Sequence, residues 1–143
     1  METIFTGDRV RRAQVSMAAK TMVSFIDDPA ARLRTRVRQL FSSPYSTLTE
    51  AAWREGYEDL IRDAAVGSAA IDPLVRHGVL QLMAVVALAT GDGALLGSAT
   101  LDNEELAMAT DHPELIGWVP FFGMQLALVA GRLDDADGLA DEM

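Results

Sequence analysis

The fold is decided by residues 72–91, which read DPLVRHGVLQLMAVVALATG. Asp72 followed by Pro73 is a strong helix start, because the carboxylate caps free backbone N–H groups and proline has the φ of a first helical residue. The residues up to Thr90 are apolar on nearly every side, and Gly91 suits the end of a helix. The longest apolar run, residues 78–89, is shorter than the about 20 residues that span a membrane. We therefore expect a buried central helix rather than a membrane anchor.

Similar signals on both sides of this segment predict helices throughout. Asp28-Pro29 and Asp111-His112-Pro113 are two more helix starts, and Thr47 with Glu50 fits a capping box. No run shows the alternation of apolar and polar residues that marks a strand. We expect an all-α fold of about seven helices, packed as consecutive antiparallel hairpins in a right-handed array or a compact bundle.

The expected layout is one domain over residues 1–143. It comprises a first helix over 9–26 and hairpins over about 29–65, 73–110 and 113–143. Pro120 lies inside the first helix of the last hairpin, where proline removes a backbone hydrogen bond. We expect a kink or a break at that position.

Two parts of the chain match at an offset of 40 residues. Pro73 aligns with Pro113, Ala87-Leu88 with Ala127-Leu128, and Gly91 with Gly131. Residues 127–136, ALVAGRLDDA, resemble the tetratricopeptide-like helical repeats of bacterial regulatory proteins, in which Ala-x-x-x-Gly ends one helix and an acidic stretch opens the next. The resemblance covers about residues 73–143 and implies protein or peptide binding. The period exceeds the 34 residues of that family, and its early Trp-Leu-Gly pattern is missing.

Composition and charge exclude several function classes. The 143 residues include no cysteine, which excludes a disulfide scaffold, a thiolate zinc site and a cysteine nucleophile. The net charge of −9 argues against nucleic acid as a partner. The N-terminal residues show no export signal, so we expect a cytoplasmic protein. Residues 1–62 carry a net charge of +2 and residues 63–143 a net charge of −11, a division that favours contact between copies or with a partner.

The most distinctive charge run consists of Arg32, Arg34, Arg36 and Arg38. On a helix these arginines flank an apolar stripe that includes Leu33, Val37 and Leu40. Their stems can cover the edges of the core while the charged ends remain in water. Alternatively, they can contact an acidic surface of a partner or of this chain, or nucleic acid or an anionic membrane surface. The run is therefore a candidate interaction surface.

A second candidate is the aromatic group around Pro120, formed by Trp118, Phe121 and Phe122 together with Met124. These side chains can pack in the core. If the helix is broken at the proline, they can instead line an apolar groove for a peptide or a hydrophobic ligand.

Other motifs do not support catalysis, a metal or a cofactor. His77 and His112 are not spaced as metal ligands, and we expect both at the surface or at a helix cap. The acidic run 134–138 has the wrong spacing for a calcium loop, and the glycines near residue 91 follow a predicted helix rather than the strand that a phosphate loop requires. No nucleophile–base arrangement is evident.

Three functional hypotheses follow. The first is a non-enzymatic protein-binding module that self-associates, because the last hairpin is short and leaves an apolar edge. The second is a ligand-sensing regulatory domain with an apolar pocket near Trp118. The third is a small acidic inhibitor, immunity-type or phage assembly protein, whose acids meet a basic target.

Overall fold

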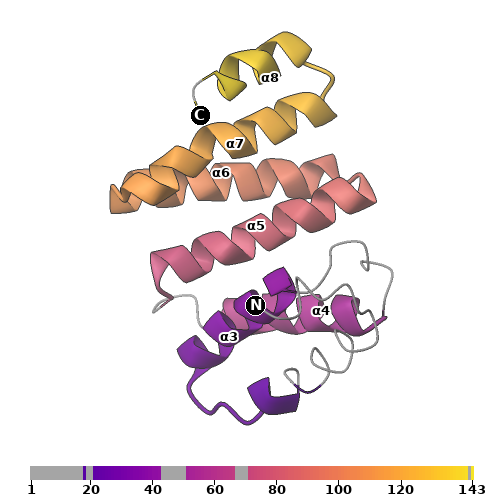
Figure 1. Ribbon diagram of the computed structural model, residues 1–143, viewed down its shortest axis with the longest axis vertical. Helices are drawn as coiled ribbons and strands as arrows, with labels where there is room; N and C mark the ends of the chain where they lie inside the picture. Colours follow the sequence, from indigo (N-terminus) through magenta and orange to yellow (C-terminus); the bar gives the residue numbers. More distant parts are fainter. Residues whose placement is uncertain (1–17, 19–20, 43–50, 67–70, 142) are drawn as a thin grey trace. The chain divides into compact units, whose positions relative to one another are not determined.

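The computed structural model describes residues 18, 21–42, 51–66, 71–141 and 143 (Figure 1). The all-α prediction is confirmed, and these residues include no strand. The named helices are α3 (Pro29–Ser42), α4 (Ala51–Val66), α5 (Pro73–Thr90), α6 (Gly93–Thr110), α7 (Pro113–Val129) and α8 (Leu133–Ala140). Most of the helix expected over 9–26 lies outside the described residues, as does the capping box at residues 47–50.

The chain divides into two compact units, Met1–Val75 and Arg76–Met143. The boundary falls three residues into α5, at a point where the sequence gives no sign of a linker. A single domain over 1–143 stays a prediction.

The described part of the first unit contains the antiparallel hairpin of α3 and α4. The side chain of Arg36 reaches α4 residues 23 and 27 positions further along the chain. Leu33, Leu40 and Leu60 are buried. A Cβ on Gly56 would lie 3.3 Å from a methyl group of Leu40, so the absence of a side chain there lets α4 approach α3 closely.

The second unit contains helices α5 to α8, with α7 packed against both α6 and α8. Its core consists of apolar residues from three helices: Leu80, Ala84, Ala87, Leu96, Ala99, Leu106, Ala107, Leu115 and Phe122. Leu139 of α8 lies close to Gly123 of α7, where a Cβ would be only 3.2 Å from its methyl group. The absence of a side chain at Gly123 therefore lets α8 approach α7 closely.

The turn after α5 and the turn after α7 have the same geometry, 40 residues apart. Gly91 and Gly131 both have a φ of 72°, a left-handed conformation that favours glycine. The amide of the residue after each glycine donates to the carbonyl of a buried alanine, Ala87 or Ala127, at 2.9 Å in both cases. These are the contacts of a Schellman-type helix end.

Of the expected kink or break at Pro120, the break is wrong, because α7 is continuous from Pro113 to Val129. Leu115 on one side of the proline is fully buried, and Phe122 on the other side is 1% exposed. Both belong to the core of the second unit. Packing on both sides of Pro120 thus holds the helix together although one backbone hydrogen bond is lost.

Helix α5 is long and apolar enough to cross a membrane by length and composition alone. Core helices of soluble proteins meet the same criterion. Here Leu80, Ala84 and Ala87 of α5 contribute to the core of the second unit, as expected for a packed helix.

Candidate functional site

Two arginines of the candidate run on α3 bind carboxylates within their own unit. The side chain of Arg36 is only 8% exposed and donates to Asp63 at 2.9 Å and to Asp59 at 3.1 Å. The Nε atom of Arg32 lies 3.7 Å from Asp63. These contacts make Arg32 and Arg36 part of the α3–α4 hairpin, and Arg36 in particular is too buried to meet a partner.

The other two arginines of the run, Arg34 and Arg38, are exposed. Two arginines of the run therefore contribute to the packing of α3 against α4, and the other two lie at the surface. The sequence placed the four on two flanks of one stripe, but it could not show that α4 carries carboxylates opposite one of those flanks.

His77 of α5 is buried, which corrects the expectation of a surface or capping histidine. Its Nδ1 atom lies 2.6 Å from Oδ1 of Asn103, a fully buried residue of α6. Among the described residues, His77 Nε2 and Asn103 Nδ2 are buried without a hydrogen-bond partner. Only some of the hydrogen-bonding groups of this buried pair therefore have a partner. His112, by contrast, caps α7 by accepting a hydrogen bond from the amide of Glu114 at 3.3 Å.

Aromatic rings of α7 surround the imidazole of His77. The ring centroids of Trp118 and Phe122 lie 5.5 Å and 5.9 Å from it. Burial lowers the pKa of His77 below the ordinary value of 6.5, while the hydrogen bond with Asn103 and the charge of Glu114 oppose this change. The neutral imidazole is consequently the favoured form inside the unit.

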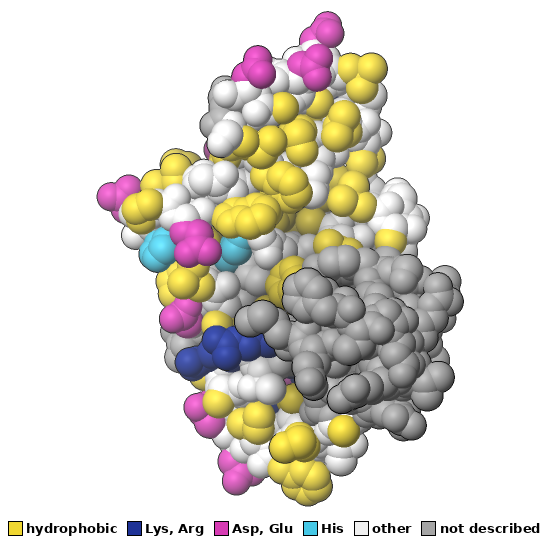
Figure 2. Space-filling view, in the orientation of Figure 1, with side chains coloured by type: hydrophobic (Ala, Val, Ile, Leu, Met, Phe, Trp, Pro, Cys, Tyr) yellow, Lys and Arg dark blue, Asp and Glu magenta, His cyan; other side chains and the backbone are white. Residues whose placement is uncertain are grey.

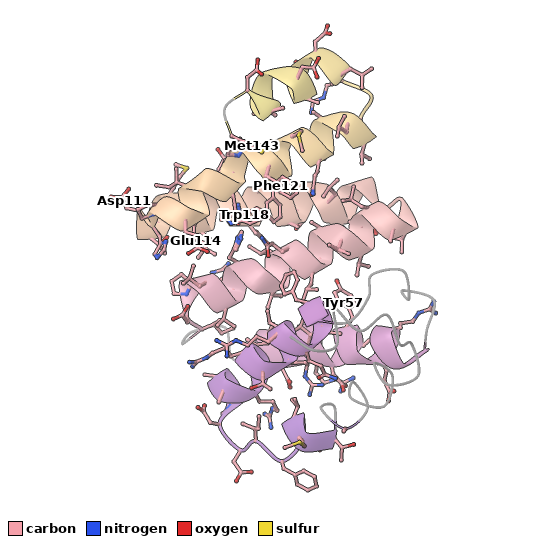
Figure 3. The ribbon with its side chains drawn as sticks, viewed as in Figure 1. Tyr57, Asp111, Glu114, Trp118, Phe121 and Met143 are labelled. Carbon is pink, nitrogen blue, oxygen red and sulfur yellow. The ribbon has the colours of Figure 1, made fainter. Side chains whose placement is uncertain are left out.

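The four residues of the predicted apolar groove have different surroundings. Phe122 belongs to the core, so it cannot line an open groove. Trp118 and Phe121 are half-buried and meet edge to face, with their centroids 5.1 Å apart. Met124 is also half-buried but is not among the residues packed on the core. Figure 3 shows Trp118 and Phe121 on α7, with Glu114 near the start of the helix.

The described residues of the second unit expose large apolar side chains on all four of its helices. The exposed residues on its helices and at the chain end are Leu88, Leu101, Met108, Ile116, Leu128, Val129, Leu133 and Met143. Figure 2 shows hydrophobic side chains gathered over α7 and α8, with acidic side chains at the margin. Such a collection on a folded unit is typical of an interaction surface.

Charge is divided unequally between the units. Residues 1–75 contain ten basic and ten acidic residues and are neutral overall, whereas residues 76–143 contain two basic and eleven acidic residues, a net charge of −9. One of those two basic residues, Arg132, is paired with Asp135 at 2.7 Å. The second unit therefore carries the whole net charge of the chain.

The described residues include no group of three histidine, aspartate or glutamate side chains that could hold a metal ion. Comparison with known proteins found no matching family model, curated protein or solved structure.

Proposed function

We propose that the chain is a non-enzymatic, cytoplasmic protein-binding module built from helical hairpins. The main support for this proposal is the set of large apolar side chains that the second unit leaves exposed, including Leu128 at 50% and Leu133 at 64%. The repeated turn geometry at Gly91 and Gly131 supports a hairpin repeat of the tetratricopeptide-like kind, whose extended surfaces bind peptides.

Self-association is the first alternative to binding a different protein. Two second units that meet would bring together two units that each carry a net charge of −9, and like charges oppose such a contact at low salt. We therefore favour a different protein as the partner. Light scattering at two salt concentrations measures the oligomeric state directly. We expect a monomer at both concentrations.

Affinity capture with the intact chain from its host, followed by calorimetry with the purified captured protein, tests the proposal. We expect one partner that binds again in purified form with a defined stoichiometry. If no protein is enriched over an unrelated acidic control protein, at low or at physiological salt, the proposal is wrong. A hydrophobic small molecule that raises the melting temperature under those conditions would instead support the ligand-sensing alternative.

A further inference from the structure

A continuous apolar stripe runs along one side of α7. Phe121, Met124 and Leu128 follow one another at spacings of three and four residues, which places them on one helical face. Leu115 and Phe122, the core residues of the same helix, project from a different side. Phe121 and Met124 are partly exposed and Leu128 is 50% exposed, although Phe121 also packs against the core of the unit.

The helix surface is open where the stripe begins. Gly117 lies one turn before Phe121 and is exposed. A Cβ at Gly117 would meet nothing within 4 Å. The ring of Trp118 stands next to it and contacts Phe121 edge to face. Because Gly117 has no side chain, there is space beside the ring of Trp118 for a side chain of a partner, as in helix-in-groove recognition.

The electrostatic surroundings of the stripe are negative. Glu114 lies seven residues before Phe121 and therefore on the same side of α7. Asp111 lies just before the helix, and the first turn of α8 carries Asp134 and Asp135. An apolar stripe in an acidic unit is complementary to an apolar surface with basic flanks.

From this arrangement we propose that the stripe Phe121–Met124–Leu128 binds one amphipathic helix of another protein, with leucine-type residues on its apolar face and lysine or arginine on its flanks. This inference rests on the proposed protein-binding function and names the surface and the class of partner. The apolar face of the partner helix covers the stripe, and its basic flanks approach Glu114 and the other acids of the unit. Methionine at the centre suits such a surface, because its flexible side chain adapts to different partners.

The competing apolar surface in the same unit is less suited to this role. Leu101 and Met108 are exposed and lie seven residues apart on α6. Glu104 and Glu105 lie between them in the sequence and are exposed as well. No aromatic ring among the described residues of α6 extends the apolar area there. Leu101 therefore provides a matched control, an exposed leucine on the same unit but outside the stripe.

Calorimetry with two synthetic helical peptides tests the inference on the intact chain. Both peptides carry leucine at the same positions, and their flanks are lysine in one and glutamate in the other. We expect the lysine peptide to bind at least tenfold more tightly, and its affinity to fall as salt is raised. Phe121→Ser and Leu128→Ser should each weaken binding at least tenfold, whereas Leu101→Ser should leave it unchanged.

Two results would overturn the inference. One is equal affinity for both peptides, and the other is a loss of binding in Leu101→Ser as large as that in Leu128→Ser. Failure of this surface is distinguishable from failure of the proposed function. A captured protein that still binds Leu128→Ser at full affinity refutes the stripe but keeps the binding module, whereas the absence of any captured partner refutes the module itself.

Discussion

The buried pair of His77 and Asn103 gives the sharpest test of how the second unit is stabilised. Each side chain depends on the other for its one hydrogen bond, which is 2.6 Å long, and each keeps a buried nitrogen without a partner among the described residues. Replacing only one member leaves the other with an additional unsatisfied polar atom, which costs about 1–3 kcal/mol. Replacing both by apolar residues of similar volume removes the problem and is nearly neutral or stabilising.

We therefore expect His77→Leu and Asn103→Leu each to lower the free energy of unfolding, and the double variant to be more stable than either single variant. The coupling energy should be on the order of 2 kcal/mol, within the range for residues in contact. Urea unfolding followed by tryptophan fluorescence measures it, because Trp118 lies 5.5 Å from His77. A Trp53→Phe background leaves Trp118 as the sole tryptophan.

The size of the effect is within reach of this assay. With a slope of about 1–3 kcal/mol per molar urea, a change of 2 kcal/mol moves the midpoint by roughly 1 M. The reasoning is refuted if the double variant loses the sum of the two single losses to within about 0.5 kcal/mol. Additive losses would mean that the two side chains act independently in spite of their contact.

Further predictions concern protonation, a turn and an ion pair. Burial lowers the pKa of His77 in the folded unit, so below pH 6.5 the unfolded chain binds a proton at His77 more readily than the folded unit does. The free energy of unfolding should therefore decrease as the pH falls below 6.5. Chemical denaturation at several pH values should show a weaker pH dependence of this free energy for His77→Leu. Gly131→Ala should cost about 1–2 kcal/mol because of its φ of 72°, whereas Gly97→Ala, in open space inside α6, should stabilise by about 0.5–1 kcal/mol in the same urea assay. Arg36→Met should lower the melting temperature, since it leaves two partly buried aspartates of α4 facing each other, while Arg34→Met at an exposed position should not.

Helix boundaries were predictable because they are encoded locally. Proline after a capping residue began α3, α5 and α7 where the sequence predicted, and the turn glycines ended α5 and α7. A cap or a left-handed turn involves atoms only a few residues apart. Neighbouring residues therefore suffice to predict it, and the observed helices begin at residues 29, 73 and 113 as expected.

The surroundings of side chains were harder to predict, because they depend on which faces of two helices meet. Periodicity shows that Arg36 flanks an apolar stripe, but its partners lie 23 and 27 residues away. His77 looked polar on its own helix and became buried through residues of α6 and α7. A signal was available in retrospect, since Asn103 is the one amide in an α6 face of leucine and alanine.

The composition of α7 links the architecture of the unit to its proposed role. Of its many apolar side chains, only Leu115, Phe122 and Ala127 are fully enclosed. A helix this apolar is ordinarily surrounded on all sides, yet Ile116, Leu128 and Val129 of α7 are exposed. Leu128 of the stripe is 50% exposed, and apolar area of this kind favours aggregation unless something covers it. The net charge of the second unit favours solubility in spite of the exposed apolar side chains. In our proposal the same charge favours a basic partner helix over a second copy of the chain.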